Sequence, residues 1–323
     1  MDTKTSKEPA VAVGYDIGGT EMKIAAMGAG NSRPLHTQKI PTPKTYRDFL
    51  EGMRNLFAEL KRAQNNLNDK VIGVGMPGVL DRARGQITLS NNLPWVIGKP
   101  LRADLERVLV SEVALENDAN CFVLAEANVG AGAAYDFVMG VILGTGLGGG
   151  MVINKRLHVG PHGFTGEYGG NPLPWAPADA PPAIEAFAGK ENRAADILSA
   201  PGLVKLYKAF GGNGGDDVTA VTVMHRYRAN EEPAQKAFRY FVDAVARMVA
   251  QKVHDIDPNT IVFGGGLSNI AELYDLLPDR VSRYLMRTRD TPTPLRTPLK
   301  KASLGDAAGS IGAALLTRQV KTR

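Results

Sequence analysis

The sequence predicts a two-lobed α/β fold, and three observations lead to this expectation. Short apolar runs typical of buried strands alternate with longer stretches that have helical periodicity. A strand–glycine turn–strand arrangement at residues 11–27 recurs at residues 137–153. With 323 residues, the chain is long enough for two domains that each bury a core. Two such units at this distance predict two related domains that face each other across a cleft.

The individual elements follow from the same periodicities. Strands are expected at residues 11–17, 22–27, 35–40, 71–74, 112–115, 137–143, 151–153 and 261–263, and the first three form an antiparallel meander. Helices are expected at residues 46–67, 101–109, 119–131, 238–253, 270–286 and 307–316. Asn117 or Asp118 supplies the N-cap of the helix at 119–131. Loops are expected at the Pro/Ala-rich residues 176–183 and the Gly-rich residues 211–217.

No linker divides the chain sharply, so the two domains are expected to share a hinge. We expect an N-terminal lobe of residues 1–120, completed by a C-terminal helix within residues 306–323. A larger C-terminal lobe then covers residues 121–305.

Composition excludes several classes of protein. The net charge is +5, but the basic residues are dispersed, and Arg280, Arg283 and Arg287 have the spacing of one solvated helical face. Nucleic-acid binding is therefore not expected. No window approaches eighteen uninterrupted apolar residues, and the N-terminus has no apolar core like that of a signal peptide. The single cysteine, Cys121, excludes an internal disulfide and a thiolate zinc cluster, which predicts a cytoplasmic protein.

Two glycine turns carry hydroxyl side chains and suit a polyphosphate such as that of ATP. Backbone N–H groups and a threonine hydroxyl bind phosphate oxygens, a lysine adds charge, and an aspartate suits a Mg²⁺ shell. The first turn supplies Asp16, Gly18, Gly19, Thr20 and Lys23, and the second supplies Gly144, Thr145 and Gly146. A third glycine run can lie against the nucleoside and consists of Gly264, Gly265 and Gly266. Either turn alone could be an ordinary hairpin turn. The two together are harder to explain in that way.

Asp118 is the candidate catalytic residue. At a helix start the helix dipole favours the ionised carboxylate, and phosphoryl transfer needs a carboxylate that accepts the hydroxyl proton of the attacking alcohol. The alternative is that Asp118 only caps its helix. Asn117 and Asn92 are candidates for sugar hydroxyls, Glu167 suits a pair of adjacent hydroxyls, and the turn at Gly78 lets backbone approach a ligand closely. These parts predict an ATP-dependent kinase acting on a small polyol.

Over nearly its whole length the chain resembles the ROK family of sugar kinases and repressors. The resemblance rests on residues 16–20, 73–78, 117–120, 143–150, 166–169 and 262–269. It implies an actin/hexokinase-like (ribonuclease H-like) ATPase fold with a central cleft, ATP and Mg²⁺ as cofactors, Asp118 as general base, sugar contacts from Asn92, Asn117 and Glu167, and a homodimer. Residues 98–105 resemble bacterial N-acetylglucosamine kinases, whereas residues 171–175 are more similar to the fructokinase (mannokinase) branch.

One departure from the family concerns zinc. The family usually continues its Glu-x-Gly segment with a histidine and a three-cysteine zinc loop. Here Gly170 stands in place of the histidine, and residues 176–183 replace the loop. The pattern resumes at residues 184–187, which makes Glu185 the last sugar-contacting carboxylate. We therefore expect no structural zinc and a looser sugar pocket.

The leading hypothesis is a kinase that phosphorylates the 6-hydroxyl of a hexose or N-acetylhexosamine: N-acetylglucosamine, fructose, glucose or mannose. A repressor needs a helix-turn-helix ahead of the first glycine turn, and only ten residues precede the first expected strand. The segments at Asn117, Asp118 and Glu167 argue against an actin- or chaperone-type ATPase. A catalytically weak, sugar-binding or regulatory member of the family is the remaining alternative. In an active kinase, sugar binding should compact the molecule, because closure excludes water.

Overall fold

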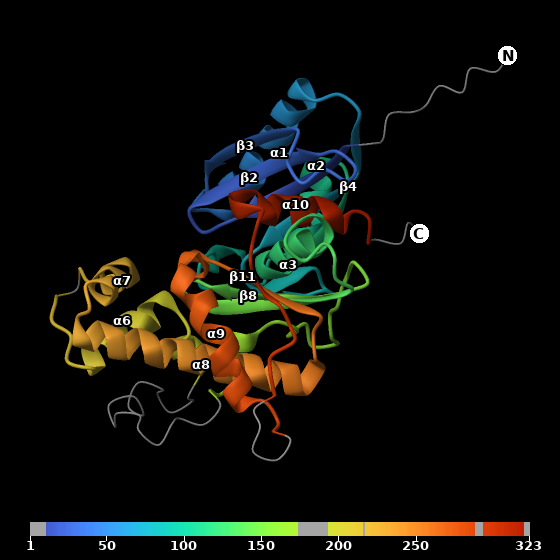
Figure 1. The fold of residues 1–323 in the computed structure, drawn as a ribbon. Helices are drawn as coiled ribbons and strands as arrows, with labels where there is room; N and C mark the ends of the chain where they lie inside the picture. Colours follow the sequence, from blue (N-terminus) through green and yellow to red (C-terminus); the bar gives the residue numbers. More distant parts are fainter. Residues whose placement is uncertain (1–10, 174–192, 216, 288–292, 320–323) are drawn as a thin grey trace. The chain divides into compact units, whose positions relative to one another are not determined.

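The computed structural model describes residues 11–173, 193–215, 217–287 and 293–319 (Figure 1). The chain divides into two compact units. Unit 1 comprises Met1–Ala134, Met151–Thr165 and Ser303–Arg323, and unit 2 comprises Tyr135–Gly150 and Gly166–Ala302. The expected boundary after residue 120 falls inside α3 (Asp118–Val129), a helix that lies whole in unit 1. The division into lobes of residues 1–120 and 121–305 stays a prediction.

Unit 1 is built on one sheet with the strand order β3-β2-β1-β4-β7. The strands are β1 (Val11–Ile17), β2 (Glu21–Met27), β3 (His36–Pro41), β4 (Leu67–Met76) and β7 (Glu112–Asn117). The first three form the antiparallel meander that the sequence predicts, and β4 and β7 run parallel to β1. β1 and the end of β4 are buried on both faces, which explains their nearly continuous apolar sequence.

Helices cover both faces of this sheet. Alternate residues of β1, such as Val13 and Tyr15, pack in one core with α1 (Tyr46–Ala63) and α2 (Leu101–Leu109). The opposite face packs against α3 and α10 (Ala308–Leu316), which lie together in Figure 1. A Cβ on Gly73 would collide with the carbonyl of Ala313. Glycine in β4 therefore lets α10 lie directly on the strands.

The segment after α1 differs from the expectation. The helix was predicted to run to residue 67, but it ends at Ala63, and β4 begins at Leu67. Asn66 has a φ of 62°, a left-handed conformation that asparagine tolerates and that ends a helix. The hairpin of β5 (Val79–Asp81) and β6 (Gln86–Leu89) was not predicted, because its strands are short and carry few apolar residues.

The second sheet has the strand order β10-β9-β8-β11-β12. Its strands are β8 (Phe137–Leu143), β9 (Leu147–Ile153), β10 (Arg156–Leu157), β11 (Thr260–Gly264) and β12 (Leu299–Lys301). β8, β11 and β12 are parallel. The end of β9 and all of β10 belong to unit 1, and the other strands belong to unit 2.

The helices of unit 2 gather around α8 (Figure 1). In the part of unit 2 that the structure describes, they are α5 (Ala194–Ile197), α6 (Ala200–Ala209), α7 (Ala220–Arg228), α8 (Glu232–Ile256) and α9 (Ala271–Tyr284). α6, α7 and α9 all pack on α8, whose Phe238, Phe241 and Val245 are fully buried. Short 3₁₀ turns are η1 (Pro94–Val96), η2 (Tyr168–Gly170), η3 (Gly266–Asn269) and η4 (Gly305–Ala307). No helix among the described residues is long and apolar enough to span a membrane.

Glu126 of α3 is a fully buried carboxylate that binds backbone amides from two separate segments. It accepts hydrogen bonds from the amides of Ala131 at 2.7 Å, Ser303 at 2.9 Å and Leu304 at 2.9 Å. Ala131 precedes the point where the chain leaves unit 1, and Ser303 is the residue where it returns. The charge is satisfied by these amides, so α3 holds two of the four chain connections on the unit 1 side, those near residues 134 and 303.

Candidate functional site

The turn between β1 and β2 places Asp16 beside the start of α10. Asp16 lies opposite Lys23 in the antiparallel register, and the Lys23 ammonium donates a hydrogen bond to the carbonyl of Asp306 at 3.0 Å. A Cβ on Gly309, in the first turn of α10, would collide with the Asp16 carboxylate. The positive end of the α10 dipole therefore lies at this carboxylate.

The charge on Asp16 is poorly compensated in the described structure. Burial, and next the neighbouring charge of Asp118, raise the pKa of Asp16 to about 6, while Lys23 opposes this rise. Two nearby carboxylates with one ammonium suit a cation. Magnesium ions in phosphate-transfer sites often take only one or two protein carboxylates and complete their shell with water and phosphate oxygens. The residues present therefore fit a Mg²⁺ ion that arrives with a nucleotide.

The backbone of Gly18 in this turn is hydrogen-bonded within the protein, whereas the sequence predicted amides free to bind phosphate. The Gly18 amide donates to the carbonyl of Glu21 at 2.8 Å, and the Gly18 carbonyl accepts from the Thr42 hydroxyl at 2.7 Å. Gly18 therefore has no backbone donor left for a phosphate, contrary to the free amide that the sequence suggested. The Thr20 side chain is exposed. A phosphate contact from Gly19, Thr20 or Lys23 stays a prediction.

Asn117 and Asp118 both lie at the start of α3, and they have different hydrogen-bonding roles there. Asn117 is the N-cap, and its side-chain oxygen accepts from the amides of Ala119 at 2.8 Å and Asn120 at 3.3 Å. Asp118 is the first helical residue, and its Oδ1 accepts from the Ala119 amide at 2.9 Å. Burial raises the pKa of the Asp118 carboxyl, and hydrogen bonds from backbone amides partly offset this rise. Asn117 thus provides most of the helix cap. Asp118 is a partly buried carboxylate that the cap does not require.

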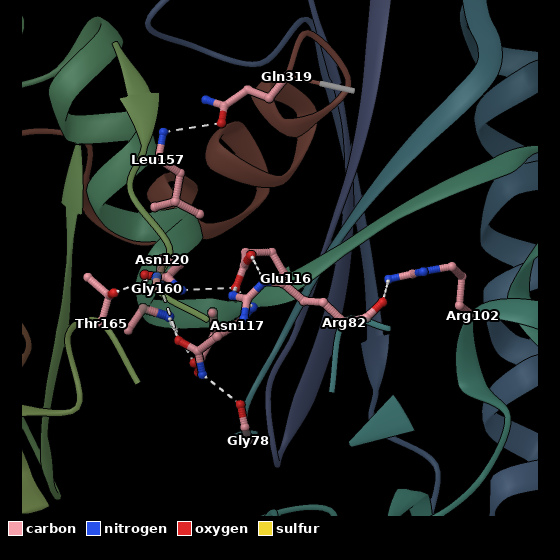
Figure 2. Close-up of polar contacts among 12 residues, drawn as sticks. Gly78, Arg82, Arg102, Glu116, Asn117, Asn120, Leu157, Gly160, Thr165 and Gln319 are labelled. Carbon is pink, nitrogen blue, oxygen red and sulfur yellow. Dashed lines mark hydrogen bonds and ion pairs between the residues drawn. The ribbon is translucent and has the colours of Figure 1, made fainter. Parts of the chain in front are cut away.

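Glu116, the residue before the cap, anchors a polar network that the sequence did not reveal (Figure 2). Its buried carboxylate binds the Arg82 guanidinium through both oxygens, with Arg82 Nε at 3.1 Å from Oε2. It also accepts from the Asn117 amide at 2.8 Å and from the Asn120 side chain at 2.9 Å. Arg82 lies just after β5, so an unpredicted hairpin holds the start of α3. The only sequence signal for Glu116 was a charged residue at the end of an apolar strand.

The remaining candidates of unit 1 lie around this network. The Asn117 side-chain amide donates to the carbonyl of Gly78 at 3.0 Å (Figure 2). Gly78 has a φ of 132°, and a Cβ there would collide with the carbonyl of Leu89, so the β4–β5 turn requires glycine. Asn92 is exposed and borders the first turn, since a Cβ on Gly19 would lie 3.1 Å from its Cβ. The structure therefore connects Asn117 with Gly78 and sets Asn92 beside Gly19.

Unit 2 contains a cavity of about 430 Å³ beside the second glycine turn. Gly144, Thr145 and Gly266 line it, and their part in nucleotide binding stays a prediction. Gly146, Gly264 and Gly265 do not; Gly265 has a φ of 81° and approaches the carbonyl of Leu143. The sequence missed the rest of the wall, which consists of Ala200, Ala220, Val221, Met224, Arg228, Leu267, Asn269 and Ile270.

Gly144 and Gly266 are not required by the protein's own packing. A Cβ on either would meet no atom within 4 Å, and neither has a positive φ. Gly73 of β4, by contrast, has no room for a side chain. The bare backbone at Gly144 and Gly266 therefore leaves space inside a cavity whose size suits a small-molecule ligand. The apolar wall suits the base of a nucleotide, and the exposed backbone beside it suits the phosphates.

Arg228 forms the polar end of this wall. Its guanidinium binds Glu272, at the start of α9, through both oxygens at 2.7 and 3.1 Å. The pair joins the end of α7 to α9. The capping box at Thr219 and Thr222 was the sequence signal that could have located α7.

Glu167 lies at the start of η2 and is exposed. The preceding Gly166 has a φ of 94° and approaches the carbonyl of Gly149, so the loop requires glycine there. Glu167 belongs to unit 2, whereas Asn92, Asn117 and Asp118 belong to unit 1. Glu185 and the replacement loop at 176–183 lie outside the described residues.

The described residues contain no group of three or more His, Cys, Asp or Glu side chains that could hold a metal ion. Cys121 is fully buried, and burial raises the pKa of its thiol well above the ordinary value. It is therefore a thiol packed in the core. The expectation that the protein lacks structural zinc stays a prediction.

Unit 1 carries a pair of nearby carboxylates and unit 2 carries a glycine-lined cavity, features that suit a protein that binds phosphate groups. Residues 12–320 match the ROK family. The chain is 37% identical to the N-acetyl-D-glucosamine kinase of Pectobacterium atrosepticum over 308 residues, covering 94% of this chain and 97% of that protein.

Solved structures agree with this result. The chain resembles the ROK hexokinase of Thermus thermophilus with a TM-score of 0.78, 30% identity, and 95% and 97% of the two chains covered. It also resembles the ROK glucokinase of Streptomyces griseus bound to glucose and AMPPNP, with a TM-score of 0.72, 26% identity, and 96% and 100% covered. The chain belongs to the ROK family and has the two-lobed actin/hexokinase-like fold. It is a sugar kinase, an ATP-dependent phosphotransferase.

Proposed function

We propose that the protein transfers the γ-phosphoryl group of ATP to the 6-hydroxyl of N-acetylglucosamine or of a closely related hexose. The identity of 37% to a kinase named for N-acetyl-D-glucosamine supports this sugar, and fructose, glucose and mannose are the alternatives. The observation that carries the mechanism is the start of α3, where Asn117 caps the helix and leaves Asp118 as a partly buried carboxylate. Its chemistry is that of a general base.

The ATP side of the reaction is assigned to unit 2. The adenosine would lie against the apolar wall of α7 and Leu267, and the phosphates would approach the backbone of Gly144 and Thr145. When bound, Mg²⁺ would neutralise charge on the phosphate oxygens, and Asp16 is the residue that would hold it. The Gly144 amide already donates to the carbonyl of Gly146 at 3.0 Å, so the phosphate donor in this turn would be the Thr145 amide.

The sugar side is assigned mainly to unit 1. Asp118 would accept the proton of the attacking hydroxyl and hold its oxygen in line with the phosphoryl group. Asn92 and one remaining N–H of the Asn117 side chain would bind sugar hydroxyls, while the other polar atoms of Asn117 serve the cap and Gly78. Glu167 and Glu185 would supply carboxylates for further hydroxyls.

Replacement of Asp118 by Asn tests this mechanism. Asp118→Asn keeps the size and the Oδ1 acceptor but removes the basic site, so kcat should fall by a factor of roughly 10² or more while sugar and ATP still bind. Asp48→Asn is the matched control, because Asp48 also lies in the first turn of a helix, α1, and is exposed. Near-normal turnover in Asp118→Asn would remove Asp118 from the mechanism.

A further inference from the structure

A second cavity of unit 2, of about 400 Å³, lies where the first half of α8 meets the end of α9. The two helices pack against each other, and α9 crosses α8 in Figure 1. None of its lining residues lines the cavity beside Gly144. It is therefore a separate site, and the sugar kinase activity assigns it no role.

The lining of this cavity has a surplus of positive charge. Lys236 and Arg239 reach it from α8, and Arg280 and Arg283 reach it from α9. Among the described residues, Asp243 is the one carboxylate that lines it. Charges of one sign in a concave, low-dielectric site focus the field and concentrate ions of the opposite sign.

Asp243 is already occupied by partners within the protein. The Tyr284 hydroxyl donates to its two oxygens at 2.7 and 2.8 Å. Arg247, whose side chain is completely buried, lies 3.3 Å from Oδ2, and Arg280 lies 3.7 Å from Oδ1. This one carboxylate therefore compensates Arg247 and Arg280 and cannot neutralise the other cations.

Two arginines remain without compensation. Within the described part of the chain, neither Arg239 nor Arg283 has a carboxylate partner. Lys236 pairs with Glu232 at 2.7 Å, but both side chains are largely exposed, and such pairs are weak. The helical spacing of Arg280, Arg283 and Arg287 predicted a solvated face. Arg283 and Arg287 are exposed, in line with this expectation, and Arg280 and Arg283 also line the cavity, whereas Arg287 does not.

Aromatic side chains form the apolar part of the lining. The rings of Phe210 and Tyr240 lie 6.2 Å apart, and the Arg247 guanidinium lies over the Tyr240 ring at 5.6 Å. Such rings suit an apolar or planar group next to the charged end of a ligand. The volume also falls in the range of small-molecule sites.

A second copy of the chain is a poor occupant of this cavity. A two-fold contact through this patch would bring two surfaces with the same surplus of positive charge together. Like charges oppose such a contact. A small anion satisfies the same arginines without that repulsion.

We propose that this cavity binds a small organic phosphate. Arg239 and Arg283 would hold the phosphate oxygens, because guanidinium groups match phosphate geometry with paired hydrogen bonds. The organic part would lie against Phe210 and Tyr240. The proposal does not depend on which sugar the kinase phosphorylates.

Isothermal titration calorimetry with phenyl phosphate at physiological salt tests the proposal. The double variant Arg239→Gln/Arg283→Gln should raise the Kd at least roughly tenfold, because it removes two charge-assisted contacts. The control Arg54→Gln/Arg62→Gln removes the same charge from exposed arginines of α1 and should leave the Kd unchanged. Sugar phosphorylation should be the same in all three proteins, which shows that each is folded.

Two further ligands separate the contribution of the phosphate group to the binding affinity from that of the ring. Inorganic phosphate should bind more weakly than phenyl phosphate, because it lacks the ring, and neutral benzyl alcohol should bind more weakly still. The proposal is overturned if phenyl phosphate does not bind at millimolar concentration, or if the double variant binds it as well as the wild type does. Equal binding of benzyl alcohol and phenyl phosphate would also overturn it.

Discussion

Adjacent residues at the start of α3 show how a short polar segment can serve both structure and chemistry. The Asn117 side chain caps the helix and reaches the carbonyl of Gly78. Glu116 is buried and holds Arg82, the Asn117 amide and Asn120 (Figure 2). Glu116 and Asn117, the two residues before Asp118, are thus each held by defined hydrogen bonds. The consequence is a fixed carboxylate on a rigid element, which is what in-line transfer needs.

The protonation of Asp118 should be visible in the pH dependence of the reaction. Burial raises the pKa of its carboxyl above the ordinary value, and a general base works only when deprotonated. The kcat/KM for the sugar should therefore fall as the pH decreases, with a midpoint above the usual aspartate value of about 3.9. A pH–rate profile measures this midpoint. A profile that stays flat down to pH 4 would contradict the assignment.

Glu116 should act as a positioning residue. Glu116→Gln places an NH₂ group where the carboxylate accepts hydrogen bonds, so it should lower the free energy of unfolding by about 1–3 kcal/mol. If the network also aligns Asp118, kcat should fall roughly tenfold at an unchanged KM for ATP. Glu59→Gln, on the exposed face of α1, is the control. Loss of stability with an unchanged kcat would leave Glu116 a purely structural role.

At the scale of elements, the strength of the local pattern decided what could be predicted. The strand at 137–143 and the helix at 101–109 have the predicted bounds, because Gly144 ends the strand and Pro100 precedes the helix. α7 was missed because Val221, Thr222 and Val223 are β-branched and favour strands, and packing on α8 overrides that preference. The residues of α7 that line the cavity beside Gly144 were therefore not predicted either. The sequence showed where the glycine loops lie. It did not show which of their amides donate hydrogen bonds within the protein.

The glycine turn between β8 and β9 offers a direct test of the nucleotide pocket. Gly144→Ala adds a methyl group that meets no protein atom within 4 Å, so thermal stability should be nearly unchanged. The same methyl group would occupy the cavity and should raise the KM for ATP several-fold. Gly170→Ala, equally open but outside this cavity, should change neither quantity. An unaffected KM in Gly144→Ala would place the phosphates elsewhere.

For the whole molecule, two units of like construction explain why one chain can carry both halves of a phosphoryl transfer. The repeated strand–glycine turn–strand unit was visible in sequence and supported the fold, which the solved relatives confirm. The homodimer, the cytoplasmic location, the absence of zinc and the compaction on sugar binding stay predictions. Small-angle scattering with and without sugar measures the last of these.

Sugar-dependent release of ADP tests the central claim most directly. ADP release should be measured with saturating ATP and Mg²⁺ against N-acetylglucosamine, glucose, mannose and fructose, and the product should be located by phosphorus NMR. We expect the highest kcat/KM with N-acetylglucosamine and phosphate on its 6-hydroxyl. No release above that of Asp118→Asn with any of these sugars would contradict the account and would favour a sugar-binding protein without turnover.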